Sequence, residues 1–299
     1  MSKRSVFITG ATSKIGKHLI DKLDLSKYDV YALCRDKDHS LTPLVKIISG
    51  DLSDPGSYSP VFENHIDTVV HLGAVTHTNR IDRYYKINAE ATQELVKSCE
   101  ASAVKRFIFI STRAISDKGG DYSKSKAMAE TYVKESGLSW VIMRLAEVYG
   151  ICSDEGVDLI LNNIKKMPVV PIIGDGEYSI APVHVSDAVS AIIAVIEKDG
   201  IRNKLYNIAG PENFTYSGFI EKILGLYGIT KIKIHIPVFF ASALLRIYAM
   251  VSKKDSSLVI DQLPRLLSDK SYDISEASRD LGFSPSSLEG FIGKNGRVR

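Results

Sequence analysis

Cysteine is scarce in this sequence, and its scarcity limits the chemistry open to the chain. Among 299 residues only Cys34, Cys99 and Cys152 are cysteine, and they lie far apart without the spacing of metal ligands. Scattered cysteines of this kind argue against a disulfide framework and are typical of proteins in a reducing compartment. We therefore expect a cytoplasmic protein without a metal site.

A long uninterrupted apolar run is also missing. The most apolar stretch extends from Ile234 to Val251, but Pro237 and Arg246 interrupt it, and a spanning helix needs ~20 apolar residues. The first four residues lead directly into a predicted strand, which argues against a signal peptide. We predict a helix packed within a small C-terminal domain, with a membrane-surface helix as the alternative, and no stable insertion into a membrane.

Charge of one sign is not concentrated anywhere along the chain. The net charge is +3 and no block of lysine and arginine occurs, so the composition gives no support for a nucleic-acid partner. Hydrophobic residues make up 44% and charged residues 24% of the chain, which is ordinary for a soluble globular protein. The length suffices for one large domain or two small ones.

Strand-like and helix-like segments alternate along most of the chain. Short apolar runs predict strands at 6–8, 30–34, 45–48, 68–72, 107–110, 140–143 and 204–208. Apolar residues at helical spacing predict helices at 82–101, 121–136, 187–196, 215–226 and 237–250. Repeated strand–helix units of this kind predict an α/β fold with a Rossmann-type, doubly wound parallel sheet.

The same pattern divides the chain into two domains. Residues 1–165 form the predicted Rossmann domain, which also receives elements near 183–210. Prolines and glycines then interrupt the periodicity between 168 and 182. Residues 166–299 form a smaller, mostly helical lobe, which we expect to bind the substrate.

The first predicted strand ends in a turn that contains glycine and opens a helix. Gly10 follows 6–8 closely, and apolar residues recur at helical spacing from Ile15 onward. A strand, a tight turn and a helix N-terminus together present free N–H groups and a positive dipole end to an anion. Ser13 stands where the usual dinucleotide fingerprint has its middle glycine, so an ordinary β-turn-α corner is the alternative. We predict a phosphate site formed by Gly10, Thr12, Ser13, Lys14, Ile15 and Gly16.

The ends of the second and third strands carry further candidates, because ligands of a doubly wound sheet bind beyond the carboxyl ends of its strands. Cys34 occupies the position at which an acidic residue would select NAD, and Arg35 follows it. A guanidinium suits a 2′-phosphate, and Lys14 could assist, so NADP is favoured over NAD; a surface arginine is the alternative. Asp51, followed by Leu52, either accepts from an adenine amino group or forms a turn.

The fourth strand closes with small residues. The stretch from His71 to Val75 includes Gly73 and Ala74, which allow a cofactor to approach the main chain. His71 itself is better explained as a core histidine with satisfied hydrogen bonds than as a catalyst.

Thr112, Tyr122 and Lys126 form the most informative group of residues. Thr112 ends the fifth predicted strand, and Tyr122 and Lys126 are four positions apart, so they lie on one face of a helix. A tyrosine with a pKa near ~10 is a poor base at neutral pH, but a neighbouring ammonium lowers that pKa by stabilising the phenolate. Thr112 can hydrogen-bond the reacting oxygen. The alternative is a solvated helical face.

The sequence resembles the extended short-chain dehydrogenases/reductases, the nucleotide-sugar epimerase/dehydratase group, over nearly its whole length. The residues that carry the resemblance are Thr9–Gly16, Asp51-Leu52, His71–Ala74, Asn88, Thr112, Tyr122, Lys126, Arg144–Gly150, His184–Asp187 and Leu281–Pro285. The resemblance implies that Tyr122 is the catalytic acid/base, that Lys126 binds the nicotinamide ribose and that Thr112 positions the substrate. It also implies that Leu72, Gly73, Ala74, Thr76, Asn88 and Ala146 lie near the cofactor, with Thr76 near the substrate as well.

Two further departures from the family pattern concern the substrate. Only a short segment, 113–121, separates Thr112 from Tyr122, whereas many relatives have a longer substrate-contacting insertion. Glu147 lies where relatives commonly have asparagine, which predicts a carboxylate in the substrate pocket; a pair with Arg144 or Arg113 is the alternative.

The function implied is the oxidation, reduction or epimerisation of a secondary alcohol or ketone on a nucleotide sugar. A dehydratase of this group would carry an Asp-Glu pair after Thr112, but Arg113-Ala114 follow it here. Arg35 slightly favours a reductase with exchangeable NADP over a 4-epimerase with tightly bound NAD. The rival from another class is a non-catalytic dinucleotide-binding regulator or assembly factor. A small-molecule substrate is expected, and a homodimer is compatible with the resemblance.

Overall fold

The computed structural model describes residues 3–35, 41–151, 156–251, 261–268, 270 and 272–292. Cys152 lies outside the described residues. A seven-stranded sheet forms the centre of the molecule, with the strand order β11-β6-β5-β4-β1-β2-β3. All its neighbouring strands pair in parallel. Its strands are β1 (Arg4–Thr9), β2 (Tyr28–Cys34), β3 (Lys46–Ser49), β4 (Thr68–His71), β5 (Arg106–Thr112), β6 (Trp140–Leu145) and β11 (Lys204–Ile208).

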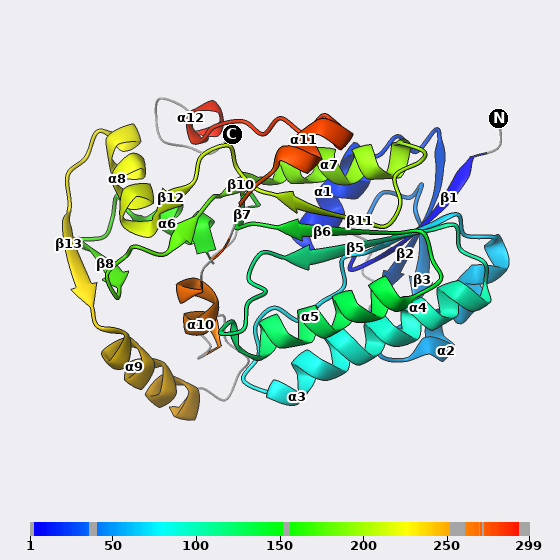
Figure 1. The fold of residues 1–299 in the computed structure, drawn as a ribbon, viewed down its shortest axis with the longest axis horizontal. Helices are drawn as coiled ribbons and strands as arrows, with labels where there is room; N and C mark the ends of the chain where they lie inside the picture. The colour runs from blue at the N-terminus through cyan, green and yellow to red at the C-terminus, as the bar shows by residue number, and fades with distance from the viewer. Residues whose placement is uncertain are drawn as a thin grey trace.

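Helices cover both faces of this sheet, as the alternation of strands and helices predicts (Figure 1). One face packs against α1 (Lys14–Lys22), α7 (Val185–Glu197) and α11 (Ser275–Leu281). On the other side lie α2 (Pro55–Tyr58), η1 (Ser59–Asn64), α3 (Ile81–Arg83), η2 (Tyr84–Glu90), α4 (Ala91–Ala101) and α5 (Gly120–Glu135). Successive strand residues alternate between these two layers: Ile8 packs on the first face and Phe7 on the second. Burial on both faces explains the continuous apolar runs. The predicted Rossmann-type fold is confirmed.

The helix predicted for residues 82–101 is present but not uniform. Its centre, η2, is a π-helical segment between α3 and α4. A π-helical turn holds an extra residue, which shifts the side chains that follow it around the helix axis. The apolar pattern does not show this insertion, because the segment keeps its buried side toward the sheet. Asn88 lies within η2 and is buried.

A smaller lobe follows the sixth strand and occupies the left side of Figure 1. Its core gathers apolar residues around Tyr149, Phe219 and Leu161. Two of its helices match the ranges expected from the sequence, α8 (Tyr216–Tyr227) and α9 (Val238–Val251). The other helices are α6 (Gly156–Asn163), α10 (Gln262–Leu267) and α12 (Leu288–Phe291). Short strands, which the sequence did not reveal, are β7 (Val148–Tyr149), β8 (Val169–Ile173), β9 (Ser179–Ile180), β10 (Val183–His184), β12 (Phe214–Thr215) and β13 (Ile232–Ile236).

Candidate active site

A cavity of about 750 Å³ lies at the carboxyl ends of the central strands. Its wall is formed by Ser13, Lys14, Ile15, Leu72, Ala74, Thr76, Ile110, Ser111, Thr112, Tyr122, Lys126, Leu145, Ala146, Val148 and Ile151. Ten of the predicted site residues are therefore brought together here: Ser13, Lys14, Ile15, Leu72, Ala74, Thr76, Thr112, Tyr122, Lys126 and Ala146. Nine other predicted residues are not part of this wall: Gly10, Thr12, Gly16, Arg35, Asp51, Leu52, Gly73, Asn88 and Glu147.

Gly10 and Gly16 make the first turn tight. Gly10 has a φ of 70°, and a Cβ at this position would lie 2.7 Å from the backbone nitrogen of Gly73. A Cβ on Gly16 would lie 2.4 Å from the carbonyl oxygen of Gly10. The two loops that follow β1 and β4 can therefore approach each other only because glycine stands at these positions.

Ser13 replaces the expected middle glycine without backbone strain. Its φ of −65° and ψ of 159° are extended values that any residue adopts. Its hydroxyl oxygen accepts a hydrogen bond of 3.0 Å from the backbone nitrogen of Gly16 and so caps α1. A hydroxyl that accepts keeps a proton to donate. The cap is thus compatible with an anion at the N-terminus of α1, where Ser13, Lys14 and Ile15 line the cavity.

Arg35 and Asp51 lie beyond this wall. Arg35 is exposed directly after β2. One carboxylate oxygen of Asp51 accepts from the backbone nitrogen of Ser53 at 2.8 Å and from its hydroxyl at 2.6 Å. These hydrogen bonds lower the pKa of Asp51, and the positive charge of Arg35 contributes to the lowering. The structure therefore shows the turn that was the alternative for Asp51, and it places a guanidinium charge near this turn.

His71 and Asn88 hold the loop that follows β4. Both ring nitrogens of His71 are hydrogen-bonded, Nδ1 to the hydroxyl of Thr9 at 2.6 Å and Nε2 to that of Thr92 at 2.9 Å. Burial lowers the pKa of His71 to about 3, so it is the neutral core histidine expected from the sequence. Asn88 accepts from the backbone nitrogen of Val75 at 2.7 Å and donates to its carbonyl oxygen at 2.9 Å. Asn88 thus fixes the cavity-lining loop instead of lining the cavity itself.

Thr112 and Tyr122 meet across the junction of β5 and α5. The Thr112 hydroxyl lies near enough to the Tyr122 phenol to lower its pKa, and the Tyr122 ring packs edge-on against Tyr84 with ring centroids 5.9 Å apart. Burial raises the pKa of Tyr122, while the positive charge of Arg265 and the Thr112 hydroxyl act in the opposite direction. Tyr122 is therefore a protonated phenol at neutral pH in the structure.

Lys126 lies on the same face of α5, as the four-residue spacing predicts. Its Nζ donates to the carbonyl oxygen of Ile110 at 2.9 Å and lies 3.9 Å from the ring centroid of Phe109. Burial lowers the pKa of Lys126 to about 7, and the negative charge of Glu130 opposes the shift. The cation whose charge lowers the pKa of Tyr122 is Arg265, and the effect expected of the Lys126 ammonium stays a prediction.

Glu130 supports this site from behind and was not identified from the sequence. It is 2% exposed and accepts from Ser111 at 2.7 Å and from two nitrogens of Arg144, each at 2.7 Å. A bidentate pair of this kind is rigid, and it ties α5 to the ends of β5 and β6. Arg144 is therefore engaged with Glu130. In the sequence, Glu130 could have been noticed because it lies four residues after Lys126, on the same face of the predicted helix.

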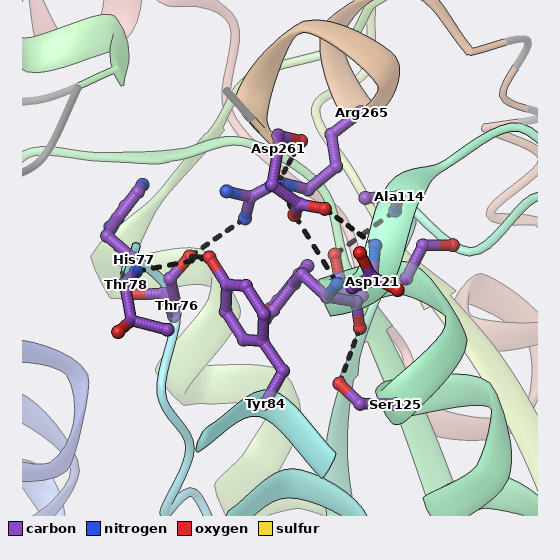
Figure 2. A network of polar contacts seen from close by, with 12 residues as sticks. Thr76, His77, Thr78, Tyr84, Ala114, Asp121, Ser125, Asp261 and Arg265 are labelled. Atoms are coloured by element: carbon purple, nitrogen blue, oxygen red, sulfur yellow. Dashed lines mark hydrogen bonds and ion pairs between the residues drawn. The ribbon is translucent and has the colours of Figure 1, made fainter. Parts of the chain in front are cut away.

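Asp261 and Arg265 of the C-terminal lobe lie beside Asp121, at the start of α5, and beside Thr76 (Figure 2). The carboxylate of Asp261 accepts from the backbone nitrogens of Asp121 at 2.6 Å and Tyr122 at 3.3 Å, so it caps the start of α5. The Arg265 guanidinium lies 4.4 Å from the centroid of the Tyr122 ring. It also donates to the carbonyl oxygen of Thr76 at 3.0 Å and forms an ion pair of 3.3 Å with Asp261. No local pattern in the sequence indicated either residue.

Glu147 lies beside the cavity and is held by residues close to the C-terminus. Its carboxylate accepts from Lys270 at 2.8 Å and from the hydroxyl of Tyr272 at 3.1 and 3.2 Å. The flanking residues Ala146 and Val148 line the cavity wall, whereas Glu147 does not. Its partners are therefore neither of the arginines that the sequence suggested.

The cavity fits a dinucleotide. It combines a tight glycine turn at the N-terminus of α1, small residues after β4 and polar groups converging on one point, within the usual ~300–1,000 Å³ of cofactor sites. Within the described ranges, no group of three histidine, cysteine or carboxylate side chains could hold a metal ion. In the same part of the chain, no helix has the length and apolar character to cross a membrane.

Comparisons with known proteins agree with this architecture. Sterol-4-alpha-carboxylate 3-dehydrogenase (decarboxylating) of Dictyostelium discoideum is 26% identical over 287 residues, which cover 84% of this chain and 85% of that protein. The structure of UDP-glucose 4-epimerase with UDP-glucose from Thermotoga maritima superimposes with a TM-score of 0.74 at 23% identity, covering 98% and 96% of the two chains. UDP-glucuronic acid 4-epimerase from Bacillus cereus, in complex with UDP-glucuronic acid and NAD, gives 0.73 at 21% identity over 95% and 94%.

The family assignment rests on a match that covers most of the chain. Residues 6–209 match the NAD dependent epimerase/dehydratase family. This range contains the first glycine turn, Thr112, Tyr122 and Lys126. The sequence match, the sheet order and the cavity therefore agree. The chain belongs to the NAD-dependent epimerase/dehydratase family of extended short-chain dehydrogenases/reductases and is an enzyme of that superfamily.

Proposed function

We propose that the protein reduces a ketone, or oxidises the corresponding secondary alcohol, on a nucleotide sugar with NADP as the exchangeable cofactor. The observation that carries this proposal is the convergence of Thr112, Tyr122 and Lys126 on a cavity that begins at the N-terminus of α1. A protein that only bound a dinucleotide would have no physical need for a buried phenol beside a threonine hydroxyl in the wall of this cavity.

The proton steps follow from the side chains. A bound nicotinamide supplies hydride transfer to or from the substrate carbon. In reduction, the Tyr122 hydroxyl donates its proton to the developing alkoxide oxygen; in oxidation, the phenolate accepts it. Thr112, which lines the cavity with Tyr122, stabilises the same oxygen. Lys126 lines the cavity one turn farther along α5, where it holds the ribose of the cofactor.

The substrate class is inferred from similar structures. The T. maritima enzyme was solved with UDP-glucose and the B. cereus enzyme with UDP-glucuronic acid and NAD. A cavity whose wall is partly apolar and partly polar accommodates both a base and a sugar. Arg113 and Ala114 after Thr112 disfavour a dehydratase, because no carboxylic acid stands there to eliminate water. A 4-epimerase remains the second candidate, since the same residues perform its proton transfer.

Tyr122→Phe tests the catalytic assignment. The substitution removes the transferable proton and keeps the ring, so turnover with a nucleotide-sugar ketone should fall by ~10²–10⁴-fold. Cofactor affinity, measured by fluorescence titration, should change little. Lys126→Met should lower turnover and cofactor affinity together. Unchanged turnover in Tyr122→Phe would leave the non-catalytic dinucleotide-binding protein as the better account.

Arg35→Ala tests the preference for NADP. A guanidinium that pairs with the 2′-phosphate should be worth ~1.5–3 kcal/mol, or at least about tenfold in affinity. We expect NADP binding to weaken by this factor while NAD binding stays constant, as measured by calorimetry. Arg202→Ala is the matched control, because Arg202 is also exposed but lies in the loop between α7 and β11. Equal loss for both cofactors would contradict the assignment and favour the NAD-dependent epimerase.

A further inference from the structure

The C-terminal lobe carries an exposed apolar surface on β13 and α9. We call it the α9 surface and define it by six large exposed side chains: Ile232, Ile234, Phe239, Phe240, Leu244 and Ile247. Phe239 is 76% exposed and Leu244 is 63% exposed. Soluble monomers rarely expose so many large apolar side chains in one contiguous region. Burial among the described residues of this chain therefore does not explain why these side chains are apolar.

In each of the two elements, the spacing places exposed apolar side chains on one side. Phe240, Leu244 and Ile247 follow the four- and three-residue spacing of one helical face. Ile232 and Ile234 are two residues apart, so their side chains lie on the same side of β13. The opposite side of that strand faces the lobe, because Lys233 pairs with Glu221 of α8 and His235 bonds the carbonyl oxygen of Gly174.

The strand and the helix are continuous along the chain and in space. Only Pro237 separates the end of β13 from the start of α9. Both elements lie at the outer end of the lobe, away from the central sheet, with α9 at the lower left of the view (Figure 1). The α9 surface is therefore accessible to a large, flat partner.

The charge of this region is of one sign. Among the described residues from Ile229 to the end of α9 at Val251, the charged residues are Lys231, Lys233 and Arg246, and neither aspartate nor glutamate occurs. Glu221, the partner of Lys233, belongs to α8. Apolar side chains bordered by cations are the composition of a helix that lies in the headgroup region of an anionic bilayer.

Other occupants fit this composition less well. A two-fold dimer through the α9 surface would bring the same cations of both copies together, which opposes association. The 14 described residues of α9 extend ~21 Å, short of the ~30 Å apolar core of a bilayer, and no helix among the described residues is long and apolar enough to span it.

We propose that the α9 surface docks on the interface of an anionic phospholipid bilayer. Phe239, Phe240 and Leu244 enter the boundary between headgroups and acyl chains. Lys231 and Arg246 meet the lipid phosphates. Docking through the lobe keeps the central sheet and the cofactor cavity outside the membrane. The proposal is independent of the substrate and of the direction of the reaction.

Vesicle sedimentation of the full chain tests this proposal. We expect binding to vesicles of phosphatidylcholine mixed with phosphatidylglycerol, weaker binding to phosphatidylcholine alone, and a decrease with added salt. The double variant Phe239→Ser/Leu244→Ser should lower the affinity for the mixed vesicles at least about tenfold, because it removes two inserted side chains. Lys231→Gln/Arg246→Gln should reduce the preference for the anionic lipid.

A matched control separates docking from general hydrophobicity. Leu44 is 72% exposed on the other domain, so Leu44→Ser removes an equally exposed apolar side chain and should leave vesicle binding unchanged. Circular dichroism should show the same fold for all variants, since the altered apolar side chains and Arg246 are exposed. Lys231 is half-buried, and glutamine keeps an N–H group that can donate to the carbonyl oxygen of Lys165 as the lysine does. Absence of vesicle binding would overturn the proposal. So would equal loss in Leu44→Ser, or concentration-dependent dimerisation that Phe239→Ser/Leu244→Ser abolishes without any vesicle binding.

Discussion

At the scale of single residues, the environment of Tyr122 differs from what the sequence implied. The sequence predicted a tyrosine activated by Lys126, four positions along one helix. The structure confirms their shared helical face, but the cation over the phenol ring is Arg265. Burial raises the pKa of Tyr122, and Arg265 is the main charge that lowers it. A residue of the C-terminal lobe therefore contributes to the acidity of a residue in the Rossmann domain.

Arg265→Met should shift the pH dependence of the reaction. Loss of the cation raises the pKa of Tyr122 further, so the rising limb of kcat/KM for alcohol oxidation should move to higher pH. At neutral pH this corresponds to a fall of about tenfold for each pKa unit. Arg265→Lys keeps a positive charge and should restore most of the profile. If Arg265 served only to bind substrate, KM would rise in both variants, and the rising limb of the kcat/KM profile would remain at the same pH.

The residue scale also shows where sequence reasoning ends. Thr112, Tyr122 and Lys126 were predictable because a strand end and a helical period place them, and both are local properties. Asp261 and Arg265 contact α5 across about 140 positions of sequence, and no periodicity reports such a contact. Glu147 was visible as an unusual carboxylate, but its partner Lys270 depends on how the last segment returns to the sheet.

At the scale of elements, the loops after β1 and β4 depend on each other. Their close approach requires that no side chain stand at Gly10, where a Cβ would lie 2.7 Å from the Gly73 nitrogen and 2.8 Å from the Leu72 carbonyl carbon. Strands and helices of this domain were predictable because burial on both faces demands apolar runs. The π-helical segment η2 was not, since an inserted residue leaves the composition unchanged. Its consequence is functional, because it carries Asn88 to the loop after β4.

Gly10→Ala compared with Gly200→Ala separates backbone strain from this close approach. Both glycines have positive φ, 70° and 86° respectively, but no atom lies within 4 Å of a Cβ at Gly200. Gly200→Ala should therefore lower the unfolding free energy only by the cost of placing an alanine in the left-handed conformation, about 1–2 kcal/mol. Gly10→Ala adds an overlap and should cost about 1–3 kcal/mol more. Urea unfolding measures both, and equal costs would show that the two loops separate without penalty.

At the scale of the whole molecule, the fold was predictable in outline and the lobe only in part. Alternating strands and helices implied the doubly wound sheet, and β11 indeed returns to it at residues 204–208. The lobe's two-residue strands, β9 and β12, are too short to show any period. Its amphipathic helices were found, but an apolar face does not reveal whether protein or solvent covers it. For α9 this distinction is what the vesicle experiment decides.

Buried titratable groups make the stability of the whole fold dependent on pH. Burial lowers the pKa of His71 to about 3 and that of His77 to about 4, from 6.5. The unfolded chain therefore binds more protons below pH 6.5, and stability falls as the pH is lowered toward these values. The pKa of Lys126 is lowered from 10.5 to about 7, so the unfolded chain also binds more protons between these pH values, and stability continues to rise with pH there.

Lys126→Met isolates the contribution of this lysine. Below pH 7 both states of the wild type hold the lysine proton, so the full cost of burying the ammonium is present. Between pH 7 and 10.5 the folded state has released the proton and the unfolded state has not, so wild-type stability rises by up to about 1.4 kcal/mol per pH unit. The stability difference between Lys126→Met and the wild type should therefore be most favourable to the variant at pH 6 and should decrease steadily toward pH 10. Urea unfolding of nucleotide-free protein across this range measures it, with Lys124→Met, on the exposed side of α5, as the control expected to show no such slope. A constant difference across the range would mean that Lys126 keeps its proton in the folded protein, held by Glu130 and the Ile110 carbonyl against the cost of burial.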